Sequence, residues 1–119
     1  MNVRRGEVVL VDFPYSDDTG SKVRPALVVQ ADMWNQQLDD TILALITSSR
    51  RRRVGATTQL LIDMTTAEGR QTGLRSNSVV QCENLLTYDQ DLILRVIGHL
   101  SATAMQQIDA CLKAALGIP

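Results

Sequence analysis

Short apolar runs separated by turn-forming residues fill the first two thirds of the chain. Glu7–Phe13, Arg24–Gln30 and Thr41–Thr47 are rich in β-branched and aliphatic side chains. Runs of this composition, bounded by glycine, proline or short polar residues, predict strands. Thr57–Asp63 and Ser78–Glu83 predict two more. About five strands at this spacing indicate a small barrel or sandwich.

The apolar period changes to a helical one in the last third of the chain. A first helix is predicted around Leu92–Leu100, with Asp89 as its N-cap, and a second begins after Ser101 and ends at Gly117. The apolar stripe of the second helix, which we assign to the core or to a subunit contact, consists of Met105, Ile108, Leu112 and Leu116. Strands followed by helices predict a mainly β fold with a C-terminal helix (β+α).

Length and composition narrow the class of protein. The 119 residues are 45% hydrophobic and 21% charged, which is typical of one soluble domain spanning residues 1–119. No apolar run has the roughly 20 residues of a membrane span, and no secretory signal is recognisable. Cys82 and Cys111 have no metal-binding or redox spacing, so we expect reduced thiols in a cytoplasmic protein.

Charge is distributed unevenly, although the net charge is only −1. Residues 50–81 contain six arginines and two acidic residues, Asp63 and Glu68, and four of these arginines form the run Arg50–Arg53. A positive middle third can attract a polyanion. A run of this kind can equally be a solvated loop, and the two readings stay open at this point.

Most standard catalytic motifs are missing from the sequence. The chain has no P-loop, no GxGxxG and no cluster of metal ligands. Its single histidine, His99, lies in an apolar segment and is interpreted as structural. A Ser/His/Asp triad or a two-histidine ribonuclease site is therefore hard to build within one chain.

Arg24 and Thr47 are the remaining candidates, because one begins a predicted strand and the other ends the next. If these strands are antiparallel neighbours, both side chains lie at one edge of the sheet. A guanidinium and a hydroxyl can together stabilise charge on a phosphate. In the alternative, Arg24 pairs with an acid such as Asp17 or Asp18 and Thr47 only terminates a strand.

Three segments resemble the MazF/PemK family of toxin–antitoxin endoribonucleases: Gly6–Pro14, Lys22–Val29 and Ile46–Ser48. The block Arg-Pro-Ala-Leu-Val-Val after a glycine-containing loop is the most specific of these. Further similarity lies downstream at Leu74, Ser76, Val79, Leu86, Thr87, Ile97–Ser101, Met105 and Leu116–Gly117. The likeness covers almost the whole chain in the family's order.

The resemblance implies a small SH3-like barrel of about five to seven strands with a C-terminal helix, forming a homodimer. It implies sequence-specific cleavage of single-stranded RNA without metal or cofactor, giving 2′,3′-cyclic phosphate and 5′-hydroxyl ends. It also implies a cognate antitoxin with a disordered acidic tail, and no membrane partner. A related possibility on the same fold is a non-enzymatic toxin that poisons DNA gyrase, as CcdB proteins do.

The same resemblance assigns roles to individual residues. Arg24 would stabilise the pentavalent phosphorane, either electrostatically or with proton transfer as well, and Thr47 would hydrogen-bond the scissile phosphate. The residues expected to bind RNA are Gly20, Ser21, Lys22, Pro25, Ser48, Ser49, Arg50 and Arg51. Lys22 replaces a glycine found in many members of the family.

Overall fold

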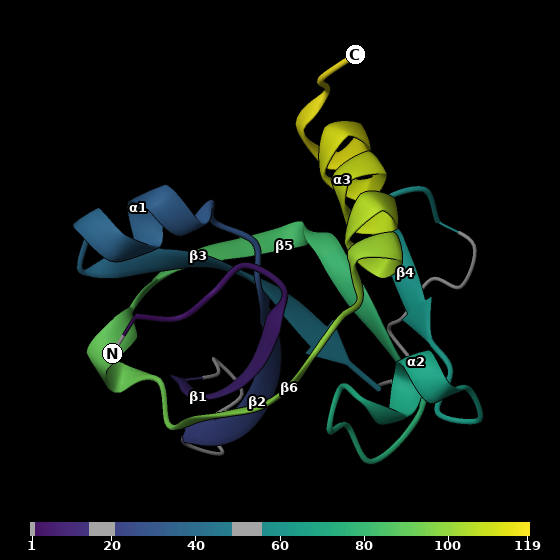
Figure 1. The fold of residues 1–119 in the computed structure, drawn as a ribbon, viewed down its shortest axis with the longest axis horizontal. Helices are drawn as coiled ribbons and strands as arrows, with labels where there is room; N and C mark the ends of the chain where they lie inside the picture. Colours follow the sequence, from purple (N-terminus) through teal and green to yellow (C-terminus); the bar gives the residue numbers. More distant parts are fainter. Residues whose placement is uncertain (1, 15–20, 49–55) are drawn as a thin grey trace.

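The structure is a computed structural model that describes residues 2–14, 21–48 and 56–119. The described chain forms a sheet of six strands in the order β4-β5-β3-β2-β1-β6, and each neighbouring pair is antiparallel. The sheet curls into a half-barrel, and the C-terminal helix packs beside β4 and β5 (Figure 1). The predicted fold class is therefore confirmed. The strands are β1 (Glu7–Pro14), β2 (Ser21–Val28), β3 (Asp40–Thr47), β4 (Gln59–Ile62), β5 (Ser78–Asp89) and β6 (Arg95–His99). The helices are α1 (Asp32–Gln37), α2 (Ala67–Arg70), the 3₁₀ turn η1 (Gln90–Leu92) and α3 (Ala102–Leu116).

Both faces of the sheet are apolar, which explains why the strand segments are continuously hydrophobic rather than alternating. Val8, Leu27 and Ala44 belong to a core cluster that also includes residues of α3. Their neighbours in sequence point to the opposite face and join a second cluster inside the curled sheet. That second cluster consists of Val3, Val9, Val11, Ala26, Val28, Leu43, Leu45 and Ile93.

The last helix begins and ends where the sequence predicted. Ser101 is the N-cap of α3, and its hydroxyl accepts a hydrogen bond from the backbone N–H of Ala104 at 3.1 Å. Gly117 ends the helix in the left-handed conformation, with φ of 70°. In the predicted stripe Ile108 is fully buried, whereas Leu116 is 58% exposed, so the stripe joins the core only over its first part.

The prediction of a helix around Leu92–Leu100 is wrong. This segment contains only the η1 turn, which Asp89 caps, and the edge strand β6. Val96 pairs with Val9 of β1, and Gly98 pairs with Val8. The helical spacing was misleading because the segment is also rich in β-branched residues and contains a glycine. These residues favour a strand over a helix, and hydrogen bonding to β1 stabilises the strand.

β5 is longer than predicted, and a short helix lies between β2 and β3. β5 continues to Asp89 instead of stopping at Glu83, because it pairs with β3 along the whole length of that strand, from Asp40 to Thr47. The polar segment around Trp34 forms the short helix α1. Trp34 itself is 46% exposed, so it is not part of the core.

A buried polar network fastens α1 to the beginning of β3. Asn35 is fully buried, and its side-chain oxygen accepts hydrogen bonds from the Thr41 hydroxyl at 2.6 Å and from the Gln30 amide at 3.0 Å. Gln90 donates to the backbone oxygen of Asn35 and accepts from the backbone N–H of Val3, both at 2.9 Å. The side-chain groups of this network find their partners within the chain, as buried polar groups generally must.

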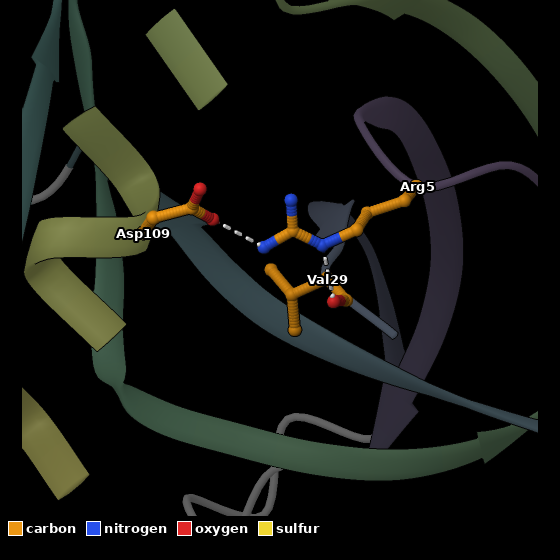
Figure 2. Close-up of polar contacts among 3 residues, drawn as sticks. All are labelled: Arg5, Val29 and Asp109. Atoms are coloured by element: carbon orange, nitrogen blue, oxygen red, sulfur yellow. Dashed lines mark hydrogen bonds and ion pairs between the residues drawn. The ribbon is translucent and has the colours of Figure 1, made fainter. Parts of the chain in front are cut away.

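Arg5 ties the N-terminal segment to α3 (Figure 2). Its Nε donates to the backbone oxygen of Val29 at 2.8 Å, and one terminal nitrogen lies 2.7 Å from a carboxylate oxygen of Asp109. The Arg5 side chain is 28% exposed and that of Asp109 52%. An ion pair exposed to this extent contributes only about 0.2–1 kcal/mol to the stability of the fold.

Candidate functional site

A pocket of about 500 Å³ opens where β2 begins and β3 ends. The loop that precedes β5 and the edge strand β6 form its other walls. Its lining residues are Leu10, Val23, Arg24, Pro25, Ile46, Thr47, Ser48, Gly73, Leu74, Arg75, Ser76, Ser78, Arg95 and Ile97. The two residues that the sequence singled out therefore line one cavity.

The antiparallel register of β2 and β3 brings Arg24 and Thr47 together. Ala26 pairs with Leu45 at the end of the ladder, Arg24 and Thr47 each lie two residues beyond this pair, and both line the pocket. Both side chains are half-buried. The prediction that these strands are antiparallel neighbours is confirmed, and it is this pairing that makes two residues far apart in sequence share a site.

Pro25 explains why a pocket forms at this edge of a closely packed sheet. Pairing between β2 and β3 spans only Ala26–Val28 on β2, so it stops next to Pro25, which has no N–H to donate. The proline also restricts Arg24 to an extended backbone. On its other side Pro25 still pairs with Leu10 of β1, which keeps the strand in place.

The wall formed by Arg75 and Arg95 was not assigned by the sequence. Arg75 follows Gly73 in the loop before β5, and Arg95 is the first residue of β6. The excess of arginine in residues 50–81 was a signal for Arg75. Nothing signalled Arg95, because a helix was predicted where β6 lies.

The charge of the pocket is positive. Its described lining contains the guanidinium groups of Arg24, Arg75 and Arg95 and no carboxylate. Hydroxyl groups stand among them, on Thr47, Ser48, Ser76 and Ser78. Guanidinium and hydroxyl groups whose described surroundings in the pocket hold no carboxylate are suited to bind an anion with several oxygens, such as a phosphodiester.

The remaining predicted contact residues are placed unequally. Pro25 and Ser48 line the pocket, whereas Lys22 is exposed on β2 outside the lining. Ser21 begins β2 and so belongs to the strand rather than to the preceding loop. The other predicted contacts, Gly20, Ser49, Arg50 and Arg51, lie outside the described residues, as do Asp17 and Asp18 of the alternative pairing.

Other titratable groups offer no competing centre in the described chain. No group of three or more His, Cys, Asp and Glu residues in these ranges is arranged to hold a metal ion. Burial raises the pKa of the Cys82 thiol to about 12, and burial also raises the pKa of Cys111, so neither thiol is a ready nucleophile. His99 is exposed on β6 and is absent from the pocket lining. None of the described helices is long and apolar enough to cross a membrane.

The sequence matches a model of the family described as PemK-like, MazF-like toxins of type II toxin–antitoxin systems, over residues 4–116. The chain belongs to this family. Among curated proteins it is similar to Endoribonuclease EndoA of Bacillus subtilis (strain 168), with 29% identity over 99% of this chain and 97% of the relative. The family resemblance drawn from the Arg24 and Thr47 segments is thus confirmed.

Solved structures share the fold. An endoribonuclease from Mycobacterial species, in complex with its cognate antitoxin, superimposes with a TM-score of 0.78 at 23% identity, over 98% of this chain and 97% of the other. MazE-MazF from Deinococcus radiodurans gives a TM-score of 0.75 at 19% identity, with both chains covered completely. At these identities the likeness establishes the architecture.

Proposed function

We propose that this protein is a toxin that cleaves single-stranded RNA without a metal ion and is neutralised by a cognate antitoxin. One observation supports this proposal most directly. Arg24 and Thr47 line the same arginine-rich pocket in a member of the MazF/PemK family. The relative from Bacillus subtilis is itself named an endoribonuclease. Family and pocket chemistry therefore agree.

The reaction needs little from the protein, because RNA carries its own nucleophile. The 2′-hydroxyl loses its proton and attacks the adjacent phosphorus, and the bond from phosphorus to the 5′-oxygen breaks. That oxygen takes up a proton, which leaves a 2′,3′-cyclic phosphate and a 5′-hydroxyl. Arg24 neutralises the charge that develops on the phosphorane, and the Thr47 hydroxyl donates a hydrogen bond to a phosphate oxygen.

Substrate and partners follow from the same proposal. The protein acts in the cytoplasm as a homodimer on short sequence motifs in single-stranded RNA. Its antitoxin presents an acidic segment. The positive charge of the pocket's arginines attracts the carboxylates of this segment as it attracts a phosphodiester. Solved relatives include a toxin with its antitoxin. Reconstitution with the antitoxin should therefore abolish cleavage.

Incubation of the purified protein with a long RNA in EDTA tests the activity. Discrete fragments with 5′-hydroxyl ends are expected, and sequencing of these ends gives the recognition motif. Arg24→Ala should slow cleavage by about 10²–10³-fold, as loss of a donor to developing charge generally does. Arg4→Ala is the matched control, because Arg4 is an exposed arginine outside this pocket.

The gyrase-poisoning alternative makes the opposite prediction. It requires RNA to stay intact and DNA gyrase to be captured, with dependence on residues of α3 instead of Arg24. Intact RNA together with a stable gyrase complex would overturn the proposed function. The family match favours RNA cleavage over this alternative.

A further inference from the structure

Arg75 and Arg95 are exposed arginines that line the same pocket as Arg24. Within the described ranges, neither guanidinium makes a hydrogen bond or an ion pair. Arg5 and Arg70 differ, since each donates to a backbone oxygen, that of Val29 and of Thr65 respectively. The structure therefore assigns Arg5 and Arg70 to local stability and gives Arg75 and Arg95 no such task.

The backbone around the two arginines is closely fitted. A Cβ added to Gly73 would come within 2.1 Å of the backbone oxygen of Ile97, and one added to Gly98 would come within 2.3 Å of that of Gln71. Gly73 also has φ of +75°, which a side chain disfavours. The backbone N–H of His99 donates to Gln71 at 3.1 Å. The loop carrying Arg75 is thus locked against the strand that carries Arg95.

The start of α3 holds the same loop from its other side. Glu68 of α2 accepts hydrogen bonds from the hydroxyl and the backbone N–H of Ser101, and from the side-chain amide of Gln71. The hydrogen bond from Ser101 lowers the pKa of Glu68, so the carboxylate stays charged at neutral pH. These contacts of β6, α2 and α3 therefore fix the backbone of the loop that carries Arg75.

Arg75 and Arg95 add two positive charges to the wall of the pocket beside Arg24, and the combined potential attracts an anion. Arg24 with Thr47 already serves one phosphate in the proposed reaction, and an RNA strand presents another phosphate at every neighbouring nucleotide. We infer that Arg75 and Arg95 form a second anion subsite of the pocket, which binds a phosphate flanking the scissile one. The identity of this anion rests on the proposed function.

Binding of a single strand that cannot be cleaved tests the subsite independently of catalysis. The probes are fluorescent 2′-O-methyl RNAs of several defined sequences, and the affinity for each is measured by anisotropy over a range of salt concentrations. The logarithm of the binding constant falls with the logarithm of salt concentration with a slope of about −0.7 per phosphate contact on single strands. Each arginine that neutralises one phosphate adds about 0.7 to the steepness of this slope, so Arg75→Gln and Arg95→Gln should each reduce the steepness by about 0.7. The double variant should reduce the steepness at least as much as either single variant.

Two control variants sharpen the measurement. Arg4→Gln removes an exposed positive charge outside the pocket and should leave the slope unchanged. Arg95→Lys keeps the charge and should restore the slope of the unmodified protein. On a cleavable RNA, Arg75→Gln and Arg95→Gln should raise KM by about three- to tenfold with little change in kcat, because a flanking contact exists before and during the reaction.

Each outcome separates the subsite from the proposed function. Unchanged slopes in a protein that cleaves RNA would overturn the subsite alone. A loss of affinity confined to particular base sequences, with the slope unchanged, would also overturn it by indicating a base contact. Reduced slopes in a protein that leaves cleavable RNA intact would support the subsite and overturn the proposed function.

Discussion

The two ends of β3 differ in what surrounds their polar side chains: one end lies in a buried hydrogen-bond network and the other lines an open pocket. At its beginning, Thr41 is fully buried and donates to Asn35 in a network closed within the chain. At its end, Thr47 is half-buried and lines a pocket whose described wall carries three arginines and no carboxylate. The first set stabilises the fold, because each group has its partner. The second set gathers guanidinium and hydroxyl groups along one pocket, an arrangement that is suited to bind an anion.

Replacement of Arg24 by lysine should give the largest effect on the pocket side. Lysine keeps the charge but loses the planar fork that contacts two phosphate oxygens, so kcat should fall by about 10²-fold or more. The midpoint of denaturant unfolding should move little, since the site contributes function rather than stability. Single-turnover cleavage and urea titration on the same preparation measure both. Retention of full activity would remove Arg24 from the catalytic role.

Replacement of Asn35 by leucine should give the largest effect on the network side. The Thr41 hydroxyl would lose its acceptor and the Gln30 amide one of its two acceptors, and stability should fall by about 2–3 kcal/mol. Urea unfolding measures the loss. Cleavage per folded molecule should stay within about twofold, because the network and the pocket lie at opposite ends of β3. A large loss of activity in fully folded protein would break the comparison.

The two threonines of β3 offer a matched pair, since valine has the same shape without the hydroxyl. Thr41→Val should cost about 1–2 kcal/mol of stability and leave kcat unchanged. Thr47→Val should slow cleavage instead, because the proposed role of this hydroxyl is to donate a hydrogen bond to a phosphate oxygen. Cleavage by Thr47→Val at the rate of the unmodified protein would contradict the separation of roles.

The smallest expected effect concerns Arg5 and Asp109. A double-mutant cycle with Arg5→Gln and Asp109→Asn should give a coupling energy of about 0.2–1 kcal/mol, since both side chains are partly solvated. Thermal or urea unfolding of the four proteins measures it, and the coupling should decrease as salt is added. A coupling above about 2 kcal/mol would mean that this arginine is more important to the fold than its exposure indicates.

Much of the fold could be predicted because it depends on neighbouring residues. Apolar runs located five strands, and Ser101 and Gly117 marked both ends of α3 from capping chemistry alone. The failure came at Leu92–Leu100, where a short apolar segment satisfies helical and strand patterns equally. Its pairing with β1 joins residues some 90 positions apart, which no local pattern records.

The candidate site divides in the same way. Arg24 and Thr47 were recognisable because consecutive strands tend to be antiparallel neighbours. Arg95 was missed because its strand was assigned to a helix. The close contacts of Gly73 and Gly98 were also invisible, since they depend on two backbones meeting in space.

By itself, the sequence determined the class of fold and the family and singled out the candidate pair Arg24 and Thr47, because strand period, helix caps and the Arg24-Pro25 block are encoded in contiguous residues. Only the tertiary structure decided that β6 is a strand, that Arg75 and Arg95 complete a positive pocket, and that Thr41 and Thr47 have different roles. The reason is that pairing across the sheet, which joins residues far apart in the sequence, sets which side chains lie in the buried network and which line the pocket.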